Sequence, residues 1–143
     1  MYVRIEEQIG FRIRGFRTNV VTQASIMEVR KKLNQALKIQ HRVPRVTYGV
    51  FFPKEHEELS VAAYYAGIVG ASTIPLENAE DVVISSGRYV IATSTNEKYD
   101  AFVFFHRIRQ ADYFRFRKAP ILEQYAYNKE TGEESVELWV PII

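Results

Sequence analysis

The segment Ile121–Tyr127, which reads ILEQYAY, is an apolar strand that carries a carboxylate among aromatic rings. A polar turn and a second apolar segment, Val136–Ile142, follow it, so together they predict a closing β-hairpin. Because side chains alternate between the two faces of a strand, Glu123 shares a face with Tyr125 and Tyr127. A carboxylate held against rings loses hydration, and a positive partner such as a ligand would relieve that penalty. In the alternative interpretation, Glu123 pairs with an arginine of the first half of the chain or lies exposed at a strand end.

The register of this hairpin decides whether a second acid joins Glu123, and the sequence leaves two registers open. With Trp139 opposite Glu123, the shared row contains Glu123, Tyr125, Glu137 and Trp139. A slip by one residue places aliphatic residues opposite that row and turns Glu137 away together with Trp139. A paired-carboxylate hydrolysis would need both acids on one side, and only the first register provides this.

The composition indicates one globular domain, residues 1–143, without cysteine. The chain has 143 residues, a net charge of +2 and 13% aromatic residues, so its rings must pack in a core or line a cavity. The lack of cysteine excludes disulfides and a thiolate nucleophile. Acids in Met1–Glu7 interrupt what would be the apolar part of a signal peptide, and no run approaches the about 20 residues of a membrane span. We therefore expect a cytoplasmic protein that does not enter the membrane.

No motif indicates a metal, a cofactor or a known catalytic constellation. The three histidines, His41, His56 and His106, lie on separate predicted elements without ligand spacing. The segment Ile84–Gly87 lacks the glycine that a nucleophile elbow needs two residues before its serine. We therefore expect neither a metal nor a cofactor, no catalytic residue is assigned, and enzyme activity stays an open question.

The order of predicted elements repeats along the chain. Each half reads strand, helix, strand, strand, with pseudo-repeats at about residues 1–75 and 76–143. This order predicts an α+β fold, in which duplicated β-α-β-β units form a pseudo-two-fold antiparallel sheet with two helices and a central ligand cleft.

Capping signals and periodicity place the individual elements. Ser25 with Glu28 is a capping box for a first helix that ends before Pro44, and Ser94 with Glu97 is the same signal for a second helix. The predicted strands outside the closing hairpin are residues 11–21, 46–52, 59–69 and 81–93, the last with a bulge at Gly87, and residues 53–58 form a polar hairpin connection. The residues that share the apolar face of the first helix are Ile26, Val29, Leu33, Ala36 and Leu37.

Three segments together resemble a known family. Ile84–Val90 (ISSGRYV), Pro120–Tyr125 (PILEQY) and Val136–Ile142 (VELWVPI), with an aromatic helix between the first two, resemble the gyrase-inhibitor-like effector-binding domains. Such domains also form the ligand-sensing part of AraC-type and MerR-type transcription regulators. The resemblance covers nearly the whole chain, with specific motifs from about residue 84 onward. Two departures concern the detail of the pocket: Ser85-Ser86 replaces the usual Pro-Ala, and the first helix lacks a tryptophan.

The resemblance implies a duplicated fold whose cleft binds lipophilic, often cationic, compounds through a buried glutamate and several rings. By motif position, that glutamate is Glu123. The candidate ring positions are Tyr65, Tyr89, Tyr99, Phe102, Tyr125 and Trp139. Regulators of the family carry a DNA-binding helical segment before this domain, whereas strand-type sequence begins here by Phe11. We therefore expect the stand-alone form, without direct DNA binding.

The leading hypothesis is a module that binds amphipathic or aromatic cationic small molecules, for drug sensing or sequestration. Two alternatives from other classes stay open. One is a hydrolase of strained electrophilic small molecules that uses Glu123 as a base with Tyr125 or Tyr99. The other is an adaptor for a protein partner, such as DNA gyrase or a regulator. A homodimer is compatible with the sequence.

Overall fold

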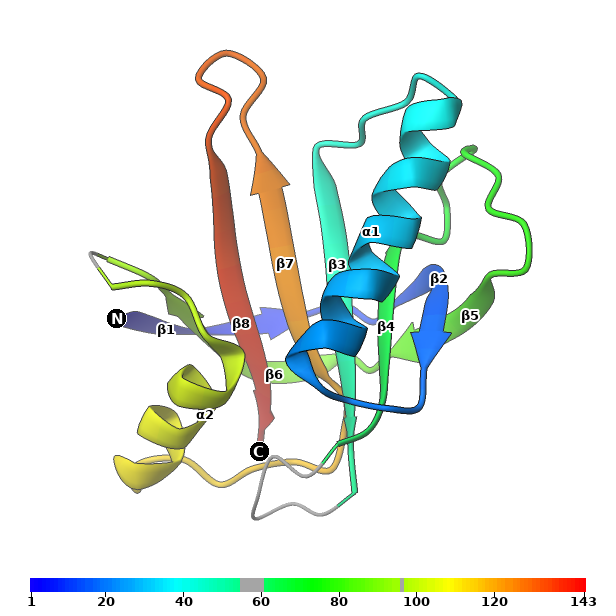
Figure 1. The fold of residues 1–143 in the computed structure, drawn as a ribbon. Helices are drawn as coiled ribbons and strands as arrows, with labels where there is room; N and C mark the ends of the chain where they lie inside the picture. Colours follow the sequence, from blue (N-terminus) through cyan, green and yellow to red (C-terminus); the bar gives the residue numbers. More distant parts are fainter. Residues whose placement is uncertain (55–60, 96) are drawn as a thin grey trace.

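One antiparallel sheet with two helices on one of its faces makes up the fold (Figure 1). The computed structural model describes residues 1–54, 61–95 and 97–143, so the predicted connection at residues 53–58 lies largely outside the described residues. Within them, eight strands pair in the order β1-β6-β8-β7-β3-β4-β2-β5. The elements are β1 (Tyr2–Gln8), β2 (Phe11–Thr18), α1 (Gln23–Ile39), β3 (Val46–Pro53), β4 (Val61–Val69), β5 (Glu80–Ile84), β6 (Gly87–Thr93), α2 (Ala101–Gln110), β7 (Ile121–Tyr127) and β8 (Glu134–Ile142).

Two copies of one unit build this sheet. The first copy contains β1, β2, α1, β3 and β4, and the second contains β5, β6, α2, β7 and β8. The strand order is symmetric about the pairing of β3 with β7: β4 and β2 follow β3 on one side, as β8 and β6 follow β7 on the other. The predicted α+β class and pseudo-two-fold antiparallel sheet are therefore confirmed, and the β3–β7 pair is the centre of the molecule.

Each unit has one strand more than the predicted β-α-β-β order. The predicted strand 81–93 is in fact β5 and β6, separated by Ser85 and Ser86, so the predicted bulge at Gly87 is wrong. Gly87 instead opens β6 with φ of 140°, a conformation that glycine adopts without a Cβ penalty. The strand β1 lies outside the predicted set because every one of its side chains is exposed or half-buried, which leaves only a weak apolar alternation.

These extra strands tie the two halves together. β1 of the first unit pairs with β6 of the second, and β5 of the second unit pairs with β2 of the first. Gln8 pairs with Gly87, and Phe11 pairs with Ile84. Two residues separate β1 from β2, and two separate β5 from β6, so the β1–β6 ladder continues in register into the β2–β5 ladder. In Figure 1 this long ribbon runs behind the central strands. Backbone hydrogen bonds therefore join the halves at the sheet edges as well as at the centre.

The cap of α1 differs from the predicted one. Thr22, in an extended conformation, accepts a hydrogen bond at its side-chain oxygen from the backbone N–H of Ser25, so Ser25 lies inside the first turn. The helix ends at Ile39, earlier than predicted, and His41 then takes φ of 54°.

No described helix is long and apolar enough to cross a membrane.

The helix α2 begins later than predicted. Asp100 is its cap, and one carboxylate oxygen accepts the backbone N–H groups of Phe102 at 3.0 Å and Val103 at 3.1 Å. Ser94 lies in the connection ahead of the helix. Its hydroxyl donates to the backbone oxygen of Glu97, whereas the Asp100 carboxylate satisfies two free N–H groups and faces the positive end of the helix dipole.

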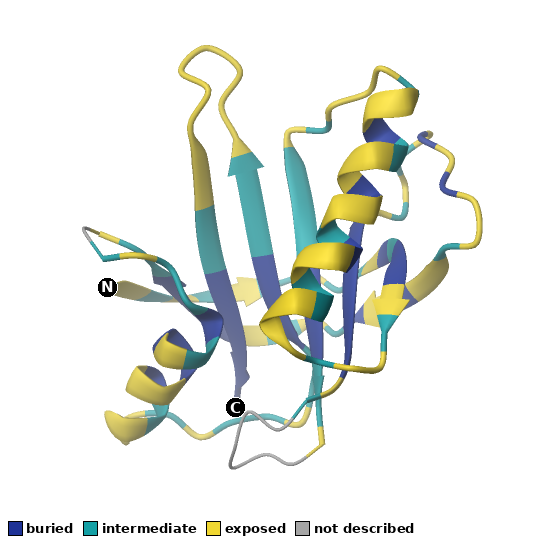
Figure 2. Ribbon diagram, in the orientation of Figure 1, coloured by how far each residue is buried: buried dark blue, intermediate teal, exposed yellow. Residues whose placement is uncertain are grey.

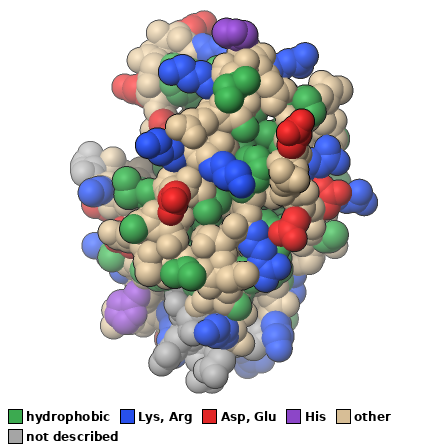
Figure 3. Space-filling view, turned by 45° about the vertical axis from the view of Figure 1, so that its right-hand side comes forward, with side chains coloured by type: hydrophobic (Ala, Val, Ile, Leu, Met, Phe, Trp, Pro, Cys, Tyr) green, Lys and Arg blue, Asp and Glu red, His purple; other side chains and the backbone are tan. Residues whose placement is uncertain are grey.

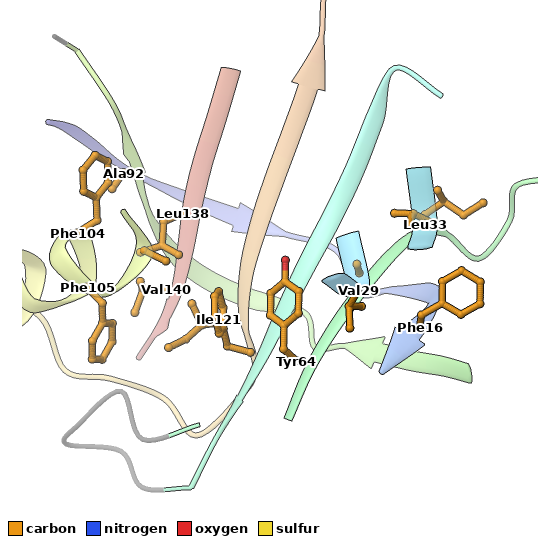
Figure 4. Close-up of a cluster of buried hydrophobic side chains, with 14 of the residues drawn as sticks. Phe16, Val29, Leu33, Tyr64, Ala92, Phe104, Phe105, Ile121, Leu138 and Val140 are labelled. Atoms are coloured by element: carbon orange, nitrogen blue, oxygen red, sulfur yellow. The ribbon is translucent and has the colours of Figure 1, made fainter. Parts of the chain in front are cut away.

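Two apolar clusters fill the two sides of the sheet. Both helices cover the same face, where Val29 and Leu33 of α1 and Phe104 and Phe105 of α2 join one cluster (Figure 4). The opposite face carries a second cluster. The buried members of that second cluster are Ile13, Val50, Ala63, Tyr65, Val82, Ile84, Tyr89, Ile91, Leu122 and Trp139.

Burial changes along the β7–β8 hairpin (Figure 2). Residues 121–123 of β7 and 138–142 of β8 are buried, whereas both strands become half-buried and then exposed toward their connecting turn. Glu123 is the last fully buried residue of β7 before the exposed part begins. A charged group at that boundary can meet a ligand that enters from the exposed end.

The cap of α2 supplies a test of the fold. We expect Asp100→Ala to lower the free energy of unfolding by about 1 kcal/mol, because two backbone N–H groups lose their acceptor. Asp100→Asn keeps an acceptor oxygen and should lose clearly less. Urea denaturation measures both variants, and equal stability of Asp100→Ala and wild type would contradict the assigned cap.

Candidate ligand-binding site

Glu123 lies at the junction of the two halves. On β7 it pairs with Gly49 of β3 on one side and with Leu138 of β8 on the other. It is 3% exposed, and among the residues that the structure describes it is the only charged residue that is buried. Burial of a carboxylate is strongly unfavourable unless hydrogen bonds or a cation compensate it, so its surroundings decide what this site can do.

Two tyrosines, one from each half, donate hydrogen bonds to this carboxylate. The Tyr64 hydroxyl of β4 donates to Oε1 at 3.0 Å, and the Tyr99 hydroxyl, from the segment before α2, donates to Oε2 at 2.5 Å. Tyr64 is fully buried, and Figure 4 shows its ring over the middle of the sheet, between the residues under α1 and those under α2. Hydrogen bonds to a charged acceptor are stronger than neutral ones, so each oxygen is compensated.

Gly49 makes the contact between Tyr64 and Glu123 possible. The two side chains meet across β3, directly over Gly49, where a Cβ atom would lie 2.2 Å from the Tyr64 hydroxyl and 2.5 Å from Glu123 Oε1. No side chain fits in that space. A glycine inside a strand often marks such a close approach, and here it leaves room for the buried hydrogen bond.

Arg30 of α1 brings a positive charge to the same site. Its Nη2 donates to Thr47 Oγ1 at 3.0 Å, and its Nη1 donates to the Tyr64 hydroxyl at 3.2 Å. Its Cζ lies 3.5 Å from the ring centroid of Tyr125, so the guanidinium stacks on that ring. The chain of contacts therefore runs from Arg30 through the Tyr64 hydroxyl to Glu123.

Burial controls ionisation in the cluster. Burial raises the pKa of Glu123 above its usual range, although the Tyr99 hydroxyl, the Arg30 charge and the Tyr64 hydroxyl act in the opposite direction. Burial and the neighbouring Glu123 charge also raise the pKa values of Tyr64, Tyr99 and Tyr125. The three phenols therefore stay protonated at neutral pH, and Tyr64 and Tyr99 act as donors to the carboxylate.

A cavity of about 600 Å³ borders this cluster at Tyr125. It lies between the C-terminal half of α1, the following loop and the exposed ends of β3, β7 and β8. Its lining residues are Asn34, Leu37, Lys38, His41, Arg42, Val43, Pro44, Arg45, Thr47, Tyr125, Tyr127 and Glu134. Figure 3 brings the α1 side of the molecule forward, where basic, acidic and apolar side chains are interspersed. Tyr125 and Thr47 therefore connect the open cavity to the buried carboxylate.

The hairpin adopts the second of the two registers that the sequence left open. Glu123 pairs with Leu138, whereas Trp139 pairs with Leu122. Glu137 thus faces away from Glu123, and its carboxylate instead contacts Arg4 at 2.7 Å. The two acids do not share a row, so the paired-carboxylate arrangement is absent from this hairpin.

The predicted ring positions separate onto the two faces of the sheet. Tyr99 and Tyr125 lie beside Glu123, with their ring centroids 6.5 Å apart and nearly perpendicular. Phe102 lies on the same face, against the helix-side cluster. The structure does not bring the other three predicted rings to Glu123: Tyr65, Tyr89 and Trp139 belong to the cluster on the opposite face.

Four residues at the site were outside the predicted set: Arg30, Thr47, Gly49 and Tyr64. The signal for Gly49 was a glycine in the middle of an apolar strand, VTYGVFFP. Alternation along β4 puts Tyr64 and Tyr65 on opposite faces, so a choice between two adjacent rings needed the strand register. An arginine of the first half was one of the partners left open for Glu123, but no local pattern singles out Arg30, because basic residues on a helix are ordinarily solvated.

The comparison with family models decides the family. A model described as the GyrI-like small molecule binding domain matches residues 1–143. The chain belongs to the GyrI-like family. It is therefore a small-molecule-binding domain, as its resemblance to gyrase-inhibitor-like domains implied. A comparison with curated proteins found no match.

Solved structures share the fold of this GyrI-like domain. SAV2435 bound to tetraphenylphosphonium is 15% identical, with a TM-score of 0.70 over 100% of this chain and 94% of that chain. The EcmrR C-terminal domain is 14% identical, with a TM-score of 0.65 over 99% of this chain and 97% of that one. An EcmrR–DNA complex is matched at 14% identity and a TM-score of 0.60, over 99% of this chain and 57% of that chain. At sequence identities of 14% to 15%, these similarities establish a shared fold and no more.

The groups that could ligate a metal are dispersed in the part of the chain that the structure describes. Among the described residues, no group of three or more histidines, aspartates or glutamates could hold a metal ion. The described residues also leave no buried side-chain nitrogen or oxygen without a hydrogen-bond partner. The groups that meet at the site are one carboxylate, three phenols and one guanidinium.

Gly49 allows a test of the contact across β3. We expect Gly49→Ala to lower the free energy of unfolding by about 1 to 3 kcal/mol, because the new methyl group forces Tyr64 and Glu123 apart in a packed core. In a Tyr64→Phe background the loss should shrink, since the atom nearest to the methyl group is gone. Chemical denaturation of the four proteins gives the coupling energy.

A Tyr65→Phe background is the matched control, because that hydroxyl lies on the other face of the sheet. The penalty of Gly49→Ala should be the same there as in wild type. Equal penalties in all three backgrounds would rule out the proposed role of Gly49.

Glu123 should make stability depend on pH. Its pKa in the folded protein is raised above the ordinary value of 4.5, so the folded state retains a proton that the unfolded state has lost. The free energy of unfolding should therefore fall as pH rises from about 4.5 through the raised pKa, by about 1.4 kcal/mol for each pH unit between the unfolded and folded pKa values, and then level off. Denaturation of wild type, Glu123→Gln and Glu137→Gln across this range measures the effect. The decline should vanish in Glu123→Gln alone, and its persistence there would assign it to another group.

Proposed function

We propose that this GyrI-like domain binds lipophilic organic cations, with Glu123 as the counter-charge and tyrosine rings as the walls. The observation that carries the proposal is the buried carboxylate of Glu123 at the junction of the halves, with a tyrosine hydroxyl on each oxygen. A buried anion ringed by aromatic groups is complementary to a large, weakly hydrated cation. The tetraphenylphosphonium bound to SAV2435 is a ligand of this kind.

The expected affinity follows from a small number of contacts. Each desolvated cation–π contact contributes roughly 0.5 to 2 kcal/mol, and apolar burial adds about 25 cal/mol per Å². Two or three ring contacts with the carboxylate would reach micromolar affinity, about −8 kcal/mol. The charge of Glu123 contributes strongly only because the site excludes water.

The cavity beside Tyr125 supplies a route and a place for the apolar part of the ligand. Its volume of about 600 Å³ lies within the range of small-molecule pockets, about 300 to 1,000 Å³. Leu37, Val43 and Pro44 offer apolar lining. Its lining carries Lys38, Arg42 and Arg45 against one acid, Glu134, so the entrance has a net positive charge and the attraction for a cation must come from Glu123 and the rings.

A binding role is better supported than the hydrolase alternative. A general base needs a free position toward its substrate, whereas each oxygen of Glu123 already accepts a hydrogen bond from a phenol. The EcmrR structures contain this fold both as a C-terminal domain and within a longer chain in complex with DNA. We therefore propose effector sensing or sequestration in the cell as the use of the site.

Calorimetric titration with tetraphenylphosphonium tests this function. We expect wild type to bind it with micromolar affinity and Glu123→Gln to bind at least about tenfold more weakly, a loss of about 1.4 kcal/mol or more. Glu137→Gln, which removes an acid on the other face of the same hairpin, should bind within about twofold of wild type. Triphenylphosphine oxide, a neutral compound of similar shape, should bind poorly to all three.

Equal affinities of wild type and Glu123→Gln would remove Glu123 from the proposed site. Thermal denaturation of each variant without ligand controls for folding. Catalytic consumption of a strained electrophile such as an epoxide, lost in Glu123→Gln, would favour the hydrolase.

A further inference from the structure

The side chain of Arg30 fills the place on Tyr125 that a ligand cation would need. Its Cζ lies 3.5 Å from the centroid of that ring, the closest of the described cation–π contacts. Tyr125 also lines the open cavity, so its ring is the first aromatic surface between the cavity and Glu123. Two cations cannot stack on the same face of one ring.

The guanidinium is held there by acceptors on rigid strands. Thr47 Oγ1 of β3 accepts from Nη2 at 3.0 Å, and the Tyr64 hydroxyl of β4 accepts from Nη1 at 3.2 Å. The backbone oxygen of Tyr48 lies 3.5 Å from Nη1 as well. Arg30 makes no hydrogen bond to Glu123 itself, so the two groups are joined by the attraction between their charges and by the Tyr64 hydroxyl that lies between them.

The side chain of Arg30 can move away from Tyr125 while α1 stays packed on the sheet. Neighbouring Val29 and Leu33 are buried and hold α1 on the sheet, whereas Arg30 is only half-buried and has a long flexible stem. A shallow hollow of about 320 Å³ on the outer side of the helix, bordered by Met27 and Asn34, also touches Arg30 and offers space for its side chain.

We propose that Arg30 is a tethered internal cation, which closes the site in the free protein and which a ligand cation must displace from Tyr125. This inference rests on the proposed function of the site. Only molecules in which Tyr125 is free of Arg30 can bind the ligand, so the apparent dissociation constant equals the intrinsic one divided by the fraction of such molecules. Arg30 thereby raises the ligand concentration at which the site fills. It also favours cations that stack on a phenol better than a guanidinium does, and it thereby acts as a specificity-determining residue.

Titration of Arg30→Gln with tetraphenylphosphonium tests the inference. We expect this variant to bind at least about tenfold more tightly than wild type, because the ring face is free and the charge on Glu123 has lost its internal partner. Lys32→Gln removes the same charge from an exposed position of α1 that borders neither the cavity nor the hollow, and it should stay within about twofold of wild type. The ratio between Arg30→Gln and wild type should persist from about 0.05 M to about 0.5 M NaCl, because direct occupancy, unlike long-range repulsion, is not screened.

Each outcome separates the inference from the proposed function. Binding by wild type with equal or weaker binding by Arg30→Gln would overturn the role of Arg30 and leave the proposed function intact, as would a gain that disappears in high salt. Binding by Arg30→Gln alone would support the role of Arg30 and the ligand class, and would contradict the micromolar affinity expected of wild type. Lack of binding by both proteins would overturn the proposed function and the inference together. Arg30→Met, which keeps an apolar stem over Tyr125, replaces Arg30→Gln if the latter does not fold.

Discussion

The buried carboxylate of Glu123 is the constraint on which the rest of the site depends. A charge in the interior is tolerated only where its hydrogen-bonding capacity is met, and here a phenol from each half of the molecule meets it. The absence of a side chain at Gly49 is what lets Tyr64 reach it across β3. The positive charge of Arg30 is tied to it through the same phenol. Each of these features would be unexplained without the carboxylate.

The site lies where it does because of the symmetry of the sheet. The two units meet at the β3–β7 pair, and the site residues come from both sides of that seam: Arg30, Gly49 and Tyr64 from the first unit, Tyr99 and Glu123 from the second. The β1–β2 and β5–β6 ribbon joins the halves at the edges and holds them in one register. A ligand at the proposed site would therefore contact both units.

Most of the strands and helices, and the face on which Glu123 lies, could be predicted from short-range patterns in the sequence. Alternation identified the strands β7 and β8 and placed Glu123 with Tyr125 on one face, and the 3.6-residue period identified the buried side of α1. Boundaries were less certain, because Thr22 and Asp100 are the caps, whereas the predicted caps Ser25 and Ser94 lie inside the first turn of α1 and ahead of α2. The exposed strand β1 has hardly any buried side chain to mark it, so its pairing with β6 could not be seen in its own residues.

The sequence by itself determined the class of fold, the repeated order of elements and the presence of an acid among rings, because those depend on periodicities of a few residues. Only the tertiary structure decided which rings surround that acid. The choice of Tyr64 over Tyr65, and the placement of Trp139 on the other face, follow from strand register, in which a shift of one residue exchanges the faces. Tyr99 reaches the acid from the segment before α2. The guanidinium of Arg30 reaches the site from a separate element through packing of α1 on the sheet, and no local pattern encodes that distance.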